Sequence, residues 1–213
     1  MTDGIDGVEL DVQLSADGVP MVIHDEKVER THAGDGWVED YTADQLQGLR
    51  SLRKKKADPL TTRIPTLTEV LDLLADSDLR INIELKNSVK PYKGLENHVL
   101  AEVGRRELNG RTMFSSFNHY SLQRLREAGW TGDLAAIYDG MLREPWRYFR
   151  ELDVQAVHPP RHVLMVPGFV TRAHRAGFAV RVWTVNKAAH RERCRRLGVD
   201  GIITDVVKPE PEW

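Results

Sequence analysis

Short apolar segments alternate with longer amphipathic segments along almost the whole chain, and this alternation constrains the fold more than any other feature. The short segments are rich in Val and Ile and have the length and period of strands, whereas the longer ones have helical period. Strands that alternate with helices form βαβ units, whose strands lie parallel in one sheet. The pattern therefore predicts an α/β protein in which helices cover a mostly parallel sheet.

The expected elements follow one another closely. Strands are expected over residues 7–14, 19–25, 80–86, 111–116, 133–139, 154–159, 178–186 and 201–205. One helix begins after the capping box of Thr66 and Glu69, and others are expected at about 43–49, 94–108, 118–128, 144–152, 166–176 and 187–197. Gly129, Gly177 and Gly198 follow three of these helices, as glycine commonly does where a helix ends.

Seven of the strands belong to βαβ units if the segment at 19–25 is an excursion beside the first strand. An eight-stranded (β/α) barrel typically takes about 250 residues, and this chain has 213. The chain is therefore shorter than such a barrel by about one strand–helix unit, and a doubly wound open sheet is the alternative. Neither an internal repeat nor a low-complexity linker divides the sequence, so we expect residues 1–213 to form a single domain.

The composition excludes several classes of protein. Apolar residues make up 41% and charged residues 29%, the usual balance of a folded globular chain. The formal net charge of -2 gives no general basic footprint for nucleic acid, and no apolar run approaches a membrane span. The single cysteine, Cys194, excludes an internal disulfide and a multi-cysteine metal site. No signal peptide is visible, so we expect a cytoplasmic protein.

Charged side chains on two of the expected strands indicate a functional site. Glu9 and Asp11 lie two residues apart, so their side chains leave the same face of the first strand. Glu84 and Lys86 share a face near the C-terminal end of the strand at 80–86, and such ends form the mouth of a barrel. Neighbouring buried carboxylates repel each other unless a cation lies between them. Three oxygen ligands for a hard cation, with a lysine that neutralises a phosphate, are one interpretation, and a solvated strand face is the other.

His24, His158 and Trp183 each end an expected strand. His24 follows three apolar residues and precedes Asp25, and the ordinary pKa of histidine suits proton transfer near neutral pH. His158 is a lesser candidate for the same role. Trp183 is by default a core residue, but at a barrel mouth it would form the wall of a substrate pocket.

Six segments, taken in order, resemble the glycerophosphodiester phosphodiesterase family. They are GVELDVQLSADGVPMVIHDEKVERTHAGDGWVEDYTADQL, IPTLTEVLDLL, INIELK, FSSFN, VWTVN and GVDGIITD, and they run through nearly the whole chain. The pattern ELDVQ…DG…P…V…HDE…R is the most specific part. The resemblance implies a TIM-type (β/α)8 barrel of the phospholipase C-like phosphodiesterase type. It also implies hydrolysis of glycerophosphodiesters to glycerol 3-phosphate and an alcohol such as choline or ethanolamine.

The resemblance also implies roles for individual residues. Members of this family hold a divalent cation, Mg²⁺ or Ca²⁺, with carboxylates and use two histidines as acid and base. Matched by position, Glu9, Asp11 and Glu84 are the metal ligands present in this chain. By the same match, His24 is one of the two catalytic histidines.

The implied partner is a small-molecule glycerophosphodiester, and two further residues contact it by the same resemblance. Lys86 is expected to contact the phosphate. Trp183 is expected to line the pocket beside the glycerol or the leaving group.

The resemblance also indicates that the first βα unit is lacking. The family opens with a strand that bears His-Arg-Gly and then Pro-Glu-Asn, and neither motif precedes Glu9 in this sequence. We therefore expect one catalytic histidine and one carboxylate ligand to be absent, with at most weak activity from these residues alone. Exposed sheet edges invite pairing, so we also expect a homo-oligomer formed through the barrel edges. The alternatives are a non-catalytic protein that binds phosphate esters or a partner, and a related phosphodiesterase acting on phospholipids.

Overall fold

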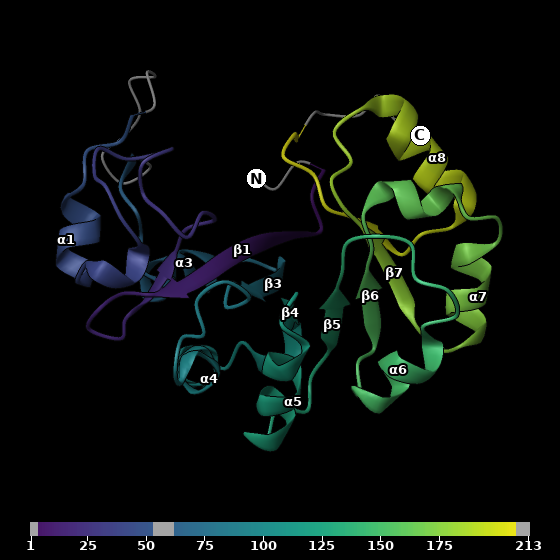
Figure 1. Ribbon diagram of the computed structural model, residues 1–213, viewed down its shortest axis with the longest axis horizontal. Helices are drawn as coiled ribbons and strands as arrows, with labels where there is room; N and C mark the ends of the chain where they lie inside the picture. The colour runs from purple at the N-terminus through teal and green to yellow at the C-terminus, as the bar shows by residue number, and fades with distance from the viewer. Residues whose placement is uncertain (1–3, 53–61, 208–213) are drawn as a thin grey trace.

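A single curled sheet forms the centre of the protein in the computed structural model, which describes residues 4–52 and 62–207 (Figure 1). The strands are β1 Gly7–Leu14, β2 Pro20–Val22, β3 Arg80–Leu85, β4 Thr112–Ser116, β5 Leu134–Ile137, β6 Ala156–His158, β7 Ala179–Val182 and β8 Gly201–Ile202. The helices are α1 Ala43–Gly48, α3 Leu67–Leu74, α4 Leu95–Arg105, α5 His119–Glu127, α6 Trp146–Glu151, α7 Phe169–Arg175 and α8 Ala188–Leu197. Short 3-10 helices cover Val38–Asp40, Asn109–Arg111 and Arg161–Met165.

The strand order decides between the two predicted architectures. The order is β2-β1-β3-β4-β5-β6-β7-β8, so from β1 onward each parallel strand lies beside the next parallel strand in the chain. A doubly wound sheet reverses its strand order at a switch point, and this sheet does not. The barrel prediction is therefore confirmed, and so is the excursion beside the first strand, because β2 pairs antiparallel with β1. Within the described residues β1 and β8 do not pair with each other, and the sheet is a half-barrel.

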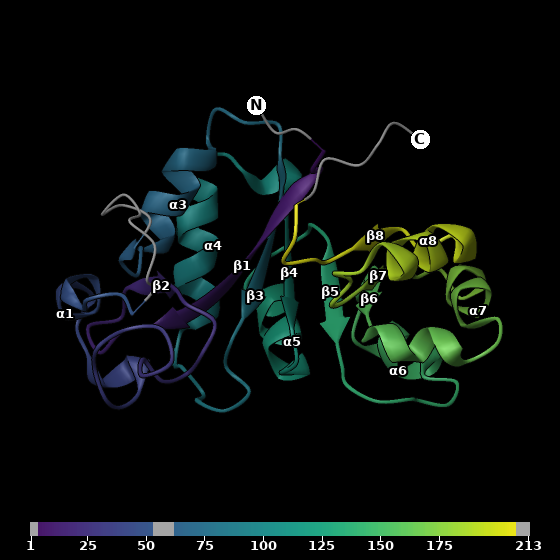
Figure 2. The same cartoon turned by 90° about the horizontal axis from the view of Figure 1, so that it is seen from above.

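The helices cover the outer face of the sheet. Figure 2 shows α3 and α4 side by side against β1 and β3. The predicted capping box starts α3, since the Thr66 hydroxyl accepts from the Glu69 backbone N–H. Beyond the cap, Leu67, Leu71 and Leu74 repeat at helical spacing and are buried in the main core. Within the described residues, no helix is long and apolar enough to cross a lipid bilayer.

Several predicted elements are shorter in the structure, the strands at 178–186 and 201–205 among them, and two of the differences have identifiable reasons. The strand expected at 19–25 ends at Val22. The buried Gln13 side chain donates hydrogen bonds to the backbone carbonyls of the next three residues, which are therefore not paired with a neighbouring strand. The helix expected at 166–176 begins only after Gly168, whose φ of 67° is left-handed. The segment from β2 to α1 packs around its own small apolar cluster, which consists of Met21, Ile23, Val28, Val38, Ala43, Leu46 and Ile64.

Candidate active site

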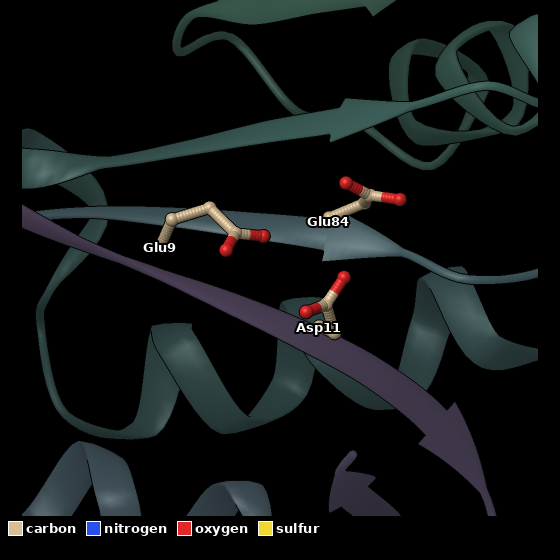
Figure 3. A group of neighbouring side chains, drawn as sticks. All are labelled: Glu9, Asp11 and Glu84. Carbon is tan, nitrogen blue, oxygen red and sulfur yellow. The ribbon is translucent and has the colours of Figure 1, made fainter. Parts of the chain in front are cut away.

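Three carboxylates meet on the concave face of the half-barrel. The parallel register of β1 and β3 places Asp11 beside Glu84, and Glu9 lies one pleat earlier on the same face of β1. One carboxylate oxygen from each of the three residues lies within 4.8 Å of the other two. Figure 3 shows the three side chains directed toward a common space between the two strands. The structure thus brings together the three carboxylates that the sequence analysis singled out.

Burial and mutual repulsion make this cluster costly to ionise. Burial and then the charges of Asp11 and Glu84 raise the pKa of Glu9 to about 8. Burial likewise raises the pKa of Glu84 to about 7, against the opposing effect of Lys86. Burial also raises the pKa of Asp11. At neutral pH the folded chain therefore resists holding all three groups as carboxylates unless positive charge is added.

Lys86 supplies part of that positive charge. Its ammonium Nζ lies 3.5 Å from Glu84 Oε1 and 3.9 Å from Asp11 Oδ1. The lysine side chain is only 13% exposed, so its charge is poorly screened by water. Lys86 therefore lies at the carboxylate cluster, where it can face a phosphate that approaches the same space.

The donor set fits a hard divalent cation. All three groups offer carboxylate oxygens, which Mg²⁺ and Ca²⁺ prefer. Glu9 Oε1 is buried and has no hydrogen-bond partner among the described residues. A buried oxygen without a partner is expected where it is positioned to bind a cation. The cluster is also the one group in the described part of the chain with three possible ligands in reach of one ion.

His24 lies on the loop that follows β2, and its side chain is 64% exposed. Its Nδ1 lies 2.6 Å from Asp25 Oδ1. Hydrogen bonds from Arg30 hold the pKa of Asp25 down at about 2, so this carboxylate stays ionised and only accepts. Nδ1 must then carry the proton of the shared bond. That tautomer leaves Nε2 as the nitrogen that is free to take or give a proton.

Gln13 positions the His24 loop, and the sequence analysis did not identify it. Its buried amide donates to the carbonyls of Ile23 (2.9 Å), Asp25 (2.8 Å) and, more weakly, the intervening His24 (3.2 Å). The Tyr92 hydroxyl donates in turn to Gln13 Oε1 at 2.8 Å. The sequence did hold a signal for this role. Gln13 shares the strand face of Glu9 and Asp11, and it is a polar residue at a position of a parallel strand where an apolar residue is usual.

Trp183 lies across the same end of the barrel, after β7. Its indole N–H donates to the His158 carbonyl at 2.8 Å, and its ring meets that of Phe117 edge-on at 5.7 Å. Phe117 follows β4 and is 38% exposed, so these two rings form an apolar wall at the mouth. His158 itself is fully buried, and this burial lowers its pKa to about 3. A neutral imidazole sealed from solvent has no route for exchanging protons with a substrate.

The fold and the cluster together are those expected of a (β/α) barrel enzyme, a class whose active sites lie at the C-terminal ends of the strands. The chain matches the Glycerophosphoryl diester phosphodiesterase family over residues 1–208. A glycerophosphodiester phosphodiesterase from Caldanaerobacter subterraneus subsp. tengcongensis is 37% identical over 202 residues, which are 95% of this chain and 83% of the relative. One from Bacillus altitudinis is 35% identical over 95% of this chain and 83% of its own length.

Solved structures agree with this assignment. A phosphodiesterase from Oleispira antarctica, in complex with the product sn-glycerol-3-phosphate, has a TM-score of 0.79 at 26% identity, covering 96% of this chain and 83% of its own. A glycerophosphodiester phosphodiesterase from Thermotoga maritima has a TM-score of 0.76 at 27% identity, covering 95% and 83%. This chain belongs to the glycerophosphoryl diester phosphodiesterase family, and the resemblance seen in its sequence is confirmed.

Proposed function

We propose that this protein cleaves glycerophosphodiesters to glycerol 3-phosphate and an alcohol, by divalent-cation chemistry with histidine acid–base catalysis. The observation that supports the proposal is the convergence of Glu9, Asp11 and Glu84 beside Lys86 at one end of a phosphodiesterase barrel. In this proposal the three carboxylates hold Mg²⁺ or Ca²⁺. The bound cation would polarise a phosphoryl oxygen and stabilise the negative charge of the transition state.

The side chains of this chain supply positioning and proton transfer. The Lys86 ammonium attracts the phosphate and holds it against the carboxylate cluster. Either water attacks phosphorus as the bond from phosphorus to the leaving oxygen breaks, or a substrate hydroxyl does so and forms a cyclic phosphate that water then opens to glycerol 3-phosphate. His24 Nε2 either takes the proton of the attacking oxygen or gives one to the leaving oxygen, and Asp25 stabilises the imidazolium in both cases. Trp183 borders the organic part of the diester.

Three further properties belong to the same proposal. Residues 1–213 act as a single domain, since one apolar cluster runs through most of the sheet and its covering helices. A cytoplasmic location, as expected from the sequence, is part of the same proposal. We also propose that copies associate through the sheet edges, because the β1 edge opposite β3 pairs with β2 only at residues 12–14.

The test is release of glycerol 3-phosphate from glycerophosphocholine with added Mg²⁺ or Ca²⁺. In line with the weak activity expected from the sequence, we expect slow release that stops when EDTA is added and in Glu84→Gln. Replacement of His24 by Ala should cost about 10²–10⁴ in rate, the usual share of one acid–base group. Glu127→Gln, at the exposed end of α5, is the matched control and should keep the parent rate. Turnover that persists in EDTA would contradict the proposal, and cation binding without turnover would favour a non-catalytic role.

A further inference from the structure

A buried polar network lies behind the segment that carries Lys86, between the end of β3 and the helices α4 and α5 (Figure 2). Asn87 follows Lys86 directly and is only 2% exposed. Glu96 on α4 is 4% exposed, and Ser121 on α5 is fully buried. Buried polar groups destabilise a fold unless they have hydrogen-bond partners, so the partners of these groups show what the network holds in place.

The network runs from Asn87 through Ser121 to Glu96. Asn87 Nδ2 donates to the hydroxyl of Ser121 and, at 3.3 Å, to Glu96 Oε1. The Ser121 hydroxyl donates in turn to Glu96 Oε1. Arg124 Nε also donates to Glu96 Oε1, at 2.9 Å, and its Nη2 donates to the Ser121 hydroxyl at 3.0 Å. These hydrogen bonds all lead toward the Glu96 carboxylate.

Glu96 is the charged centre of this network. Burial opposes its ionisation, but the hydrogen bonds from Ser121 and Arg124 outweigh burial and lower the pKa of Glu96. The ionised carboxylate accepts hydrogen bonds and donates none. Its charge therefore fixes the orientation of the Asn87 amide, whose NH2 group faces Glu96 while its Oδ1 lies 3.4 Å from the Ser116 hydroxyl.

The backbone around Lys86 is held by the same surroundings. The Ser116 hydroxyl donates to the Leu85 carbonyl at 2.8 Å, and the Lys86 N–H donates to the Val12 carbonyl at 3.0 Å. β3 ends at Leu85, so pairing with β1 fixes the chain only as far as Lys86. Beyond that point, the Asn87 side chain connects the segment to α4 and α5.

We propose that Asn87, which Glu96 holds in place, is a positioning residue that fixes where Lys86 meets the phosphate. The inference rests on the proposed function, in which the Lys86 ammonium binds the phosphate of the diester. A lysine carries its charge on a flexible four-carbon stem, so the place of the ammonium depends on how firmly its backbone is held. Lys86 Nζ lies 3.5 Å from Glu84 Oε1. A displaced backbone would move the ammonium from this place beside the carboxylates, where it faces the phosphate.

Exchanging the charges of Asn87 and Glu96 tests the network in the full chain. In saturating Mg²⁺, Asn87→Asp puts a second carboxylate against that of Glu96 and should raise the Kd for sn-glycerol 3-phosphate about 10- to 100-fold, the usual range for residues that orient a binding group. Combining Asn87→Asp with Glu96→Gln restores one carboxylate and one amide and should recover part of the loss. Asn109→Asp, on the exposed 3-10 helix before β4, is the matched control and should keep the parent Kd.

The Kd for Mg²⁺ distinguishes displacement of Lys86 from a general loss of structure. The three carboxylates of the cluster lie within β1 and β3, before the segment that Asn87 holds. Asn87→Asp should therefore leave the Kd for Mg²⁺ no higher than in the parent, while amide hydrogen exchange at Lys86 and Asn87 becomes faster. A variant in which the Kd values for Mg²⁺ and for sn-glycerol 3-phosphate rise together would overturn the inference.

The same measurements separate this inference from the proposed function. If diesters are hydrolysed but Asn87→Asp binds sn-glycerol 3-phosphate as the parent does, or if the exchange of charges recovers nothing, the positioning role is wrong and the phosphodiesterase proposal stands. If binding depends on Asn87 as described but no diester is cleaved, the proposed function fails and the positioning role stands. A parent chain that does not bind sn-glycerol 3-phosphate at all would overturn both.

Discussion

Replacing Glu9 by Gln should stabilise the protein when no divalent cation is present. The Glu9 side chain is buried beside two other acids, and its Oε1 has no hydrogen-bond partner within the described residues. A glutamine fills the same volume without a charge to ionise. The substitution therefore removes an electrostatic penalty of folding and changes packing little.

The size of the effect follows from the pKa of Glu9 in the two states. Its ordinary value is 4.5, and burial followed by the charges of Asp11 and Glu84 raises the pKa to about 8 in the folded chain. Between these values the folded state binds more protons than the unfolded state, so the free energy of unfolding falls as pH rises and levels off above pH 8. At about 1.4 kcal/mol per pKa unit, the loss at pH 7 is about 3 kcal/mol.

Urea unfolding in EDTA at several pH values measures this difference. We expect the Glu9→Gln curve to lie about 3 kcal/mol above the parent at pH 7 and to meet it near pH 4.5. Mg²⁺ or Ca²⁺ at about 1,000 times the parent's Kd should reverse the order, because this excess stabilises the parent by about 4.1 kcal/mol, while the variant lacks one ligand and binds the cation much more weakly. A variant that is less stable than the parent in EDTA at pH 7, or a parent that gains stability from pH 5 to pH 8, would refute the reasoning.

Two other predictions concern the loop that carries His24 and the sheet edge. Gln13→Leu should lower the free energy of unfolding by about 2–4 kcal/mol, because it leaves buried carbonyls without donors. It should also speed amide hydrogen exchange in residues 23–25. Unchanged exchange there would contradict the role of Gln13. Sedimentation equilibrium over a dilution series should show reversible self-association through the open edge of β1, whereas a single compact monomer at every concentration would argue against it.

The order and type of the elements could be predicted from the sequence because each carries a local signal. Period-two alternation marks β1, and the Thr66–Glu69 capping box marks the start of α3. The boundaries were less predictable where tertiary contacts decide them. The segment after Val22 has strand composition, but its carbonyls bond to the Gln13 amide and not to a neighbouring strand. That bond joins residues ten or more positions apart, so no local pattern indicates it.

The candidate site was predictable as far as strand faces allow. Alternation showed that Glu9 and Asp11 share a face, and the parallel register then brings Glu84 beside them. Alternation does not show how deeply a side chain is buried. His158 was therefore a candidate from the sequence, although the structure shows that it is completely buried.

One face of β1 organises much of the site. Its successive positions carry Glu9 and Asp11, which face the cation space, and then Gln13, which holds the loop of His24. The first two destabilise the cation-free fold by burying like charges, while the third stabilises it through satisfied hydrogen bonds. Cation binding should therefore stabilise this strand most. Because the His24 loop is hydrogen-bonded to the same strand through Gln13, the proposed proton-transfer group should become better ordered when the cation binds.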